Sequence, residues 1–523
     1  MTPSPEAALP AEFALPAPRL PVEDDAAFVN PILDAGPTSD HGDPFVLEYL
    51  GEYFLYHSGP DGIDVYRSAD LMSWEPAGVA LTGAPSGHWA EVELWAPEVV
   101  YRDGEFQMYV AATSRGGCSW NAGKAHGANG GDDEARRQGV ARSSTPLGPF
   151  VWDPTPLLDH WSIDGHPFLD DDGSEWLFYN VRNDDTRHTG GATGSGTVVD
   201  RLLPNGRLAG APTRVSYPTD EWEGHEDGLR FWNEGSFTLK RRGRYYQMYS
   251  GGFFGGDGYS VAFAVAVDVA GPWHKPSTQP IFNGRGRIRG TGHHCVVAAP
   301  DGITPYAVYH GFVADGFGRK VHADRLFWVG DRPQIARGDG RLTAPTETPQ
   351  PLPPGPVRDE DVAAFHLVGW VSGDVANVDG LRVAISRRSP SRLDVRYDGS
   401  LLSVRCNGRL VGTRSGDALP SVAGVEILHA AVTSHLDDDR EHGLEPGDER
   451  VWEWGGHLPV ECSLAVSGEV TVDFGGRSER VVAPDDEFRL VTLLSPVGAD
   501  RLRIVATGTA RVADVMLTAR APH

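Results

Sequence analysis

The fold is decided by the stretch Gly243-Arg-Tyr-Tyr-Gln-Met-Tyr249, in which a turn glycine precedes a strand of large residues that closes on tyrosine. The pattern recurs four times, at Gly51–Tyr56, Gly104–Tyr109, Gly173–Tyr179 and Gly302–Tyr309. Successive glycines are separated by 53, 69, 70 and 59 positions, which is room for a four-stranded sheet with its loops. Five such units predict a five-bladed β-propeller. A β-sandwich with unrelated hairpins is the alternative, because glycine followed by an aromatic residue is common in hairpins.

The composition agrees with an all-β protein. The 523 residues include 64 glycines and 40 prolines, and the runs between them are aromatic and β-branched with almost no helical periodicity. Apolar residues make up 40% and charged residues 23% of the chain, as in a soluble globular protein. A chain of this length is expected to form more than one domain.

Four segments are predicted along the chain. An N-terminal tail at 1–27 precedes the propeller at 28–340, and a linker with six prolines follows at 341–356. Beyond it, residues 357–523 alternate apolar and polar positions around strong turn signals such as Asn407-Gly408. This pattern predicts a C-terminal β-sandwich domain, for which three roles stay open: a wall of the active site, a sugar-binding module, or a surface for homo-oligomer formation.

The charge and the cysteines narrow the function classes. A formal charge of −26 would repel nucleic acid and anionic lipid, so a neutral ligand is favoured over either partner. The sequence has no apolar run long enough for a membrane span, and its first residues have neither a basic start nor an apolar core of a signal peptide, which predicts a cytoplasmic protein. The four cysteines lack the spacing of a disulfide framework or a zinc site.

The segments that precede the five turn glycines carry the candidate chemistry. Counting back six to nine residues gives one chemically active group or pair for each unit. These are Asp43, the run from Trp95 to Glu98, Asp164, Glu234 and the pair His293-His294. If these segments are the innermost strands, all five face one central axis, at the channel mouth where propellers bind ligands. This shared register separates them from the chain's many other acids, which are expected to be solvated turn residues.

Two carboxyls in different environments are what glycosidic bond cleavage requires. One must stay protonated to donate to the leaving oxygen, and the other must stay ionised to act on water or carbon. Glu234 lies among aromatic residues in FWNEGSF, where loss of water would raise its pKa, whereas Asp43 lies among polar neighbours in DHGDPF. Asp164 supplies a third negative charge that would help to keep Glu234 protonated.

Six blocks in this order resemble glycoside hydrolase family 43, over about residues 28–335. They are Asn30-Pro31 with Asp43-Pro44, VYRSADLMSW at 65–74, LWAPEV at 94–99, IDGHPFLDDDG at 163–173, NEGSFTLKRRGRYYQMYSGG at 233–252 and GTGHHCVV at 290–297. The chain differs from the usual family wording where glycine follows Asp164 and where serine follows Glu234-Gly235. Neither change removes a reacting group.

The resemblance implies a five-bladed propeller that hydrolyses with inversion, with Asp43 as base, Glu234 as acid and Asp164 as the acid that tunes and orients. Asp40 is the rival base, and the Asp-Pro step favours Asp43. The resemblance also implies a central histidine, His293 or His294, near a calcium or other hydrated cation, with no cofactor required for the chemistry. A structural histidine that plugs the axis is the alternative.

Two further residues are candidates for substrate binding. Trp95 can stack on a sugar face, against the alternative of a core tryptophan, and Arg289 can hydrogen-bond sugar hydroxyls, against that of a structural arginine. The Gly-rich stretch 115–131 is expected at the pocket rim. The function predicted from all these features is exo-acting release of a terminal pentose, α-L-arabinofuranose first, from short oligosaccharides. The alternatives are a β-D-xylosidase of the same family and a non-catalytic carbohydrate-binding propeller.

Overall fold

The computed structural model describes most of the chain. The described residues are 30–34, 39–102, 104–117, 136–182, 193–225, 228, 230–284, 288–313, 318–336, 364–397, 401–415, 422–438, 441–453, 460–474, 477–483, 488–494 and 501–519. The predicted tail at 1–27, the proline-rich linker at 341–356 and all but the first three residues of the Gly-rich stretch 115–131 lie outside them.

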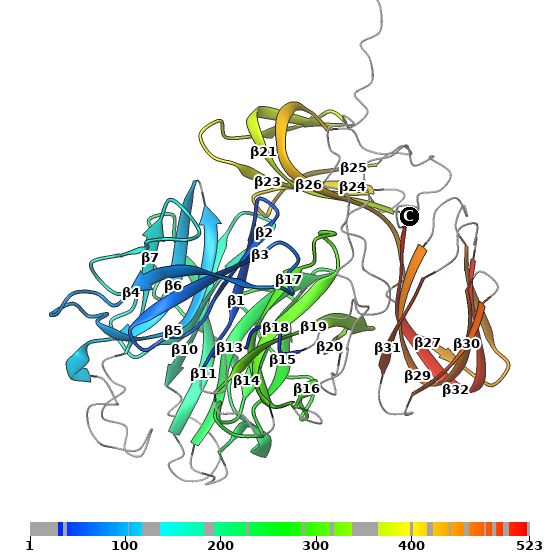
Figure 1. Ribbon diagram of the computed structural model, residues 1–523, viewed down its shortest axis with the longest axis horizontal. Coiled ribbons are helices and arrows are strands. Elements are labelled where there is room, and N and C mark those ends of the chain that lie inside the picture. Colours follow the sequence, from blue (N-terminus) through cyan, green and yellow to red (C-terminus); the bar gives the residue numbers. More distant parts are fainter. Residues whose placement is uncertain are drawn as a thin grey trace, which may run out of the picture.

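The first part of the described chain forms five antiparallel meanders, which we call blades one to five (Figure 1). Blade one contains β1 (Phe45–Tyr49), β2 (Glu52–Tyr56), β3 (Gly62–Ser68) and β4 (Glu75–Thr82). Blade two contains β5 (Val92–Arg102), β6 (Glu105–Thr113), β7 (Arg137–Ser143) and β8 (Val151–Trp152). Blade three contains β9 (Ile163–Leu169), β10 (Glu175–Arg182), β11 (Thr193–Leu202) and β12 (Thr213–Ser216). Blade four contains β13 (Arg230–Arg241), β14 (Arg244–Gly251), β15 (Ser260–Ala266) and β16 (Phe282–Asn283). Blade five contains β17 (Ile288–Ala298), β18 (Pro305–Val313), β19 (Lys320–Val329) and β20 (Arg332–Ile335).

The first strands of the blades contact one another in a closed ring, in the order β1, β5, β9, β13, β17 and back to β1. These are therefore the innermost strands, and the predicted five-bladed propeller is confirmed. Closure is reinforced by the N-terminal segment, because Asn30 exchanges hydrogen bonds with Ala323 on β19 at 3.0 and 2.9 Å.

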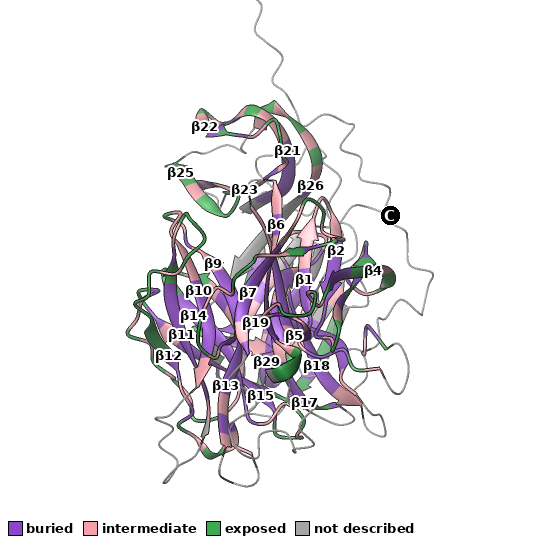
Figure 2. Cartoon of the chain, turned by 90° about the vertical axis from the view of Figure 1, so that its left-hand side faces the viewer, coloured by how far each residue is buried: buried purple, intermediate pink, exposed green. Residues whose placement is uncertain are grey.

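The tyrosines that close the repeat lie on the second strand of each blade, in the core between blades. Tyr56, Tyr109, Tyr179, Tyr249 and Tyr309 are each at most 2% exposed. A buried phenol needs a hydrogen-bond partner, and Tyr249, for example, donates to Glu223 Oε1 at 2.8 Å. Figure 2 shows buried residues along the strands of the propeller in general. The repeat therefore marks the packing between blades.

The C-terminal region is also all-β, and its strands form one hydrogen-bonded network with two apolar cores. The first lobe holds β21 (Ala364–Val378), β22 (Leu381–Ala384), β23 (Ser391–Tyr397), β24 (Leu401–Cys406), β25 (Arg409–Ser415) and β26 (Val422–Asp438). The second lobe holds β27 (His442–Leu444), β28 (Glu449–Glu453), β29 (Val460–Phe474), β30 (Arg477–Ala483), β31 (Arg489–Leu494) and β32 (Arg501–Ala519). The long strands β26 and β32 pair and join the lobes.

The first lobe docks on the turns that end the innermost strands. Trp370 donates to Glu48 Oε1 at 2.8 Å beside the β1–β2 turn, and Arg405 donates to Asp171 at 3.0 Å in the β9–β10 turn. The second lobe packs Ala465 and Ala513 against Phe327 of blade five. No helix in the described part of the chain is long and apolar enough to cross a membrane.

Candidate active site

Each blade carries a left-handed residue within its innermost strand or, in blade one, two residues before it. Asp43, Ala96, Asp164, Gly235 and His293 have φ values of 57°, 49°, 55°, 61° and 47°. Around the last four, the pairing with the second strand shifts, as in a β-bulge. A bulge redirects a side chain and bends its strand. The sequence register therefore brings one group from each blade to the same level of the axis.

Backbone N–H groups at three of these positions donate to polar side chains that lie on, or just after, the second strand of a neighbouring blade. Ser58 Oγ accepts from Ala96 N–H at 2.8 Å, and Ser250 Oγ accepts from His293 N–H at 2.7 Å. His310 Nδ1 accepts from Asp43 N–H at 3.0 Å. In each case the acceptor belongs to the preceding blade around the ring, so neighbouring blades fix each other's bulges.

Asp43 lies in a cationic surrounding. Its Oδ1 atom is 3.1 Å from Arg319 Nη1 and 3.3 Å from His293 Nδ1, and its Oδ2 atom accepts from Ser58 Oγ at 2.5 Å. Burial by itself would raise the pKa of Asp43, but the Arg319 guanidinium, followed by His293, holds that pKa well below its usual range. Asp43 is therefore ionised.

Asp40, the rival base, has a different role. It binds Arg319 on the side away from Asp43, with Nη2 to Oδ2 at 2.8 Å and Nε to Oδ1 at 3.0 Å. Its side chain is 51% exposed, against 13% for Asp43. The fork between Asp40 and Arg319 thus orients the cation that faces Asp43.

Glu234 lies in the opposite electrostatic situation. It is buried, and Tyr259 donates a hydrogen bond to its Oε1 atom at 3.1 Å. Burial is the main cause that raises the pKa of Glu234 well above its usual range, and the neighbouring Asp164 raises it further. Glu234 therefore keeps its proton at pH values where Asp43 has lost its own.

The pKa of Asp164 is shifted to a value between those of Asp43 and Glu234. Its Oδ2 atom accepts from Gly235 N–H at 3.0 Å, next to Glu234 along the chain. Burial raises the pKa of Asp164 to about 6, His293 opposes the shift, and the Asp43 charge adds to it. Because the Asp43 charge raises the pKa values of both Asp164 and Glu234, and Asp164 raises that of Glu234, the structure brings the three predicted acids into one site.

The ring of Tyr259 connects the two ends of the site. It stacks on His310 with ring centres 5.5 Å apart and an interplanar angle of 5°. His310 holds the Asp43 amide, and the Tyr259 hydroxyl holds Glu234. Burial lowers the pKa of His310 to about 4, so that its ring stays neutral and Nδ1 can accept. One stacked pair therefore positions both the ionised and the protonated carboxyl.

Aromatic residues surround the mouth on the Glu234 side. Trp232 lies two positions before Glu234 on β13, and its ring is 5.7 Å from that of Phe253 in the β14–β15 loop. Phe254 in the same loop lies under Arg319, with the guanidinium 5.1 Å from the ring centre. These half-buried rings give the mouth an apolar wall beside the protonated carboxyl.

The two residues predicted to bind substrate are partly engaged. The Arg136 guanidinium lies 3.2 Å from the ring centre of Trp95, so a sugar would have to stack on the other face of that ring. Arg289 is exposed at the start of β17 and forms an ion pair with Asp257 in the β14–β15 loop. Substrate binding by Trp95 and Arg289 stays a prediction.

The histidine pair divides into two environments. His293 faces Asp43, whereas His294 is 2% exposed, near the Phe237 ring, and neither of its ring nitrogens has a hydrogen-bond partner in the structure. Two buried nitrogens of this kind fit a hydrated ion or water at the axis better than a dry plug. Among the described residues, however, no group of three or more His, Cys, Asp or Glu side chains is arranged as a metal site. Calcium therefore stays a prediction, and so does the choice between His293 and His294.

Four residues of the site were not predicted from the sequence: Ser58, Tyr259, His310 and Arg319. Arg319 lies 276 positions from Asp43 and has no motif around it. His310 had a usable signal, because it directly follows the closing tyrosine Tyr309, as Ser250 follows Tyr249. A polar residue at that place in several units would have indicated a shared role.

The role of Asp164 can be tested by pH dependence. We expect Asp164→Asn to lower the pKa of Glu234, because it removes the negative charge that helps to keep Glu234 protonated, while the amide oxygen can still accept from Gly235 N–H. The alkaline limb of kcat/KM would then move to lower pH by roughly one unit. A pH profile measures this shift, with Asp172→Asn in the exposed β9–β10 turn as the control. An alkaline limb that stays in place would contradict the assigned role of Asp164.

Comparison with known proteins gives a consistent result. The model of glycosyl hydrolases family 43 matches residues 28–332. A crystal structure of a thermostable family-43 glycoside hydrolase is 32% identical, covers 63% of this chain and 99% of its own, and superimposes with a TM-score of 0.51.

Curated relatives are more distant and differ in their named substrates. A β-D-galactofuranosidase of Aspergillus niger is 26% identical over 52% of this chain and 73% of its own. An extracellular exo-α-(1→5)-L-arabinofuranosidase of Streptomyces chartreusis is 26% identical over 54% of this chain and 82% of its own. A xylan 1,3-β-xylosidase of a Vibrio species is 26% identical over 63% of this chain and 62% of its own.

Proposed function

The chain belongs to the glycosyl hydrolases of family 43, and from that premise we propose that it releases a terminal pentose from short oligosaccharides, with Asp43 as general base and Glu234 as general acid. The observation that carries this proposal is that, within one site, the pKa of Asp43 is lowered and the pKa of Glu234 is raised. Arg319 and His293 keep Asp43 ionised, while burial and Asp164 keep Glu234 protonated. Such a pair supplies both protonation states that glycoside hydrolysis requires.

The chemical steps follow from the positions of these groups. Glu234 gives its proton to the glycosidic oxygen as the bond to the sugar breaks, and Asp43 takes a proton from the attacking water. Asp164 orients the sugar and keeps the proton on Glu234 until the bond breaks. The product is an inverted sugar if the water attacks the face opposite the leaving group, which requires the two carboxyls to be roughly 6.5 to 9.5 Å apart. A gap near 5 Å would indicate retention.

The sugar is proposed to be α-L-arabinofuranose. A furanoside is favoured because two of the relatives are named for furanosides, and the β-D-xylosidase activity named for the Vibrio relative is the alternative. The aromatic wall at Trp232 and Phe253 lies beside Glu234, which is where the leaving group departs. A cytoplasmic location also remains a proposal.

One experiment tests the proposed reaction. Chromogenic α-L-arabinofuranoside, β-D-xyloside and β-D-galactofuranoside are incubated with the protein, and the anomer formed first is read by proton NMR. We expect release from the arabinofuranoside with the opposite anomeric configuration in the first product. Preferred release from the xyloside would change the substrate, and the starting configuration in the product would overturn inversion. No release from any of them would favour the non-catalytic carbohydrate-binding propeller.

A further inference from the structure

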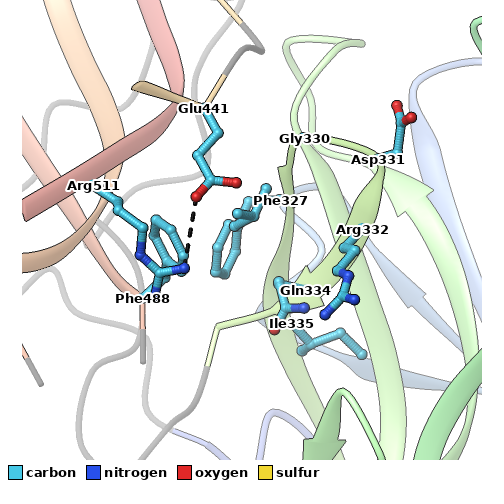
Figure 3. Close-up of a pocket in the computed structure, with 10 residues that line it drawn as sticks. Phe327, Gly330, Asp331, Arg332, Gln334, Ile335, Glu441, Phe488 and Arg511 are labelled. Atoms are coloured by element: carbon cyan, nitrogen blue, oxygen red, sulfur yellow. Dashed lines mark ion pairs between the residues drawn. The ribbon is translucent and has the colours of Figure 1, made fainter. Parts of the chain in front are cut away.

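A cavity of about 460 Å³ lies between the outer edge of blade five and the second C-terminal lobe (Figure 3). This volume is in the range of small-molecule binding sites, which often lie at domain interfaces. Its position is distinct from that of the candidate active site, because its blade-five wall is formed by β19 and β20, whereas the acids lie at the starts of innermost strands.

Two aromatic rings form apolar walls of the cavity. Phe327 comes from β19 and is almost fully buried, and Phe488 precedes β31 in the second lobe and is half-buried. Ile335 of β20 adds an aliphatic surface. Figure 3 shows the two rings contributed from opposite sides of the interface. Phe327 packs against Ala465 and Ala513. The Arg511 guanidinium lies 4.7 Å from the centre of the Phe488 ring. The face of Phe488 turned away from Arg511 is therefore the one that suits the apolar C–H face of a sugar ring.

The polar lining contains both donors and acceptors. Arg332 and Gln334 come from β20, and across the cavity Glu441 lies 3.6 Å from Arg511. Asp331 at the rim is occupied by Arg244 at 2.9 Å. An anionic ligand would meet the carboxylate of Glu441, and a cationic one would meet Arg332 and Arg511. A neutral ligand with several hydroxyls can use donors and acceptors together.

We propose that this cavity is a second, non-catalytic binding site for a neutral sugar residue of the saccharide on which the protein acts. The choice of saccharide rests on the proposed function, but binding itself does not require turnover. The site would hold one sugar residue of an oligosaccharide against the protein, which raises the local concentration of chain ends near the active site.

The test uses the full chain with Glu234→Gln, which prevents hydrolysis, in native gels that contain soluble arabinoxylan or linear arabinan. We expect migration to be slowed in at least one of the two gels. A double variant, Arg332→Ala with Gln334→Ala, removes the polar wall from the outer strand, and Phe488→Ala separately removes an apolar wall. Arg207→Ala is the matched control, since Arg207 is an exposed arginine in blade three.

Loss of retardation in both cavity variants, with retention in Arg207→Ala, would support the site. Migration that is unchanged by the cavity variants, reduced equally in the control, or never retarded in the parent would overturn it. Because Phe488→Ala removes a core contact of the lobe, thermal melting of each variant is compared, and the Arg332→Ala/Gln334→Ala result decides if Phe488→Ala unfolds. Failure of the proposed hydrolysis would appear in the chromogenic assays and not in these gels.

Discussion

Glu234→Gln should lower kcat on an arabino-oligosaccharide by about 10³-fold, within the range that a general acid contributes. Glutamine has the shape of the protonated carboxyl and can still accept the Tyr259 hydrogen bond, so binding of the substrate should change little. The proton for the leaving oxygen is the only function lost. The measurement is kcat and KM on the oligosaccharide and on a nitrophenyl glycoside with the same sugar.

The nitrophenyl substrate makes this prediction specific. Its leaving group is acidic and departs without a proton, so we expect the loss to be much smaller there. The control is Glu221→Gln, an exposed acid in the short turn Glu221–Glu223 close to the same blade. Near-normal turnover of the oligosaccharide by the Glu234 variant would remove Glu234 from its role as acid.

Asp43→Asn should show a different pattern, with a loss of about 10² to 10⁴-fold on both kinds of substrate. Water must be activated whatever group leaves, so an acidic leaving group gives no relief. The asparagine oxygen can still accept the Ser58 hydrogen bond, but an amide nitrogen then replaces the charged oxygen that faces Arg319 and His293. Steady-state rates on the same two substrates measure the effect.

Asp40→Asn is the matched control for this variant and also tests the rival base. Because Asp40 shares Arg319 with Asp43 and is itself largely exposed, we expect a smaller loss than for Asp43→Asn. If Asp40→Asn lost more activity than Asp43→Asn, the assignment of the base would be reversed. Thermal melting of both proteins shows that the comparison is made on folded chains.

The propeller and its three acids could be predicted from sequence because a repeated fold repeats its register. Counting back from each turn glycine located Asp43, Asp164 and Glu234, and the structure places Asp43 just before β1, Asp164 near the start of β9 and Glu234 in the first half of β13. The spacing differs between units, and the innermost strands contain bulges, at which residues such as Ala96, Asp164 and His293 adopt a left-handed backbone. The alternation of apolar and polar residues along a strand does not show where such a bulge lies.

The rest of the site could not be predicted, because it depends on contacts across the ring. Arg319 comes from the connection before β19, and Tyr259 comes from the residue before β15, outside the segments that the repeat marks. The closure of the ring decides which strand a polar side chain contacts. A single sequence does not show which blades become neighbours in that ring. The cation that keeps Asp43 ionised therefore emerged only with the fold.

The C-terminal region shows the same limit. Alternating residues predicted its strands, but the pairing of β26 with β32 and the two separate cores are long-range choices. The interpretation of this region as a wall of the active site is not supported, because the first lobe docks at the turns beyond Glu48 and at Asp171, where innermost strands end. The acids lie where those strands begin.

That arrangement separates selection for substrate binding at one end of the propeller from selection for stability at the other. The loops around the mouth, such as the one that carries Phe253 and Phe254, can accept insertions and substitutions without touching the lobe that braces the other end of the blades. Changes that adapt the loops to a new sugar then need not affect the stability of the propeller. The lobe stabilises one end of the propeller while the loops at the other end can vary in sequence. This fits a fold whose relatives are named for several different sugars.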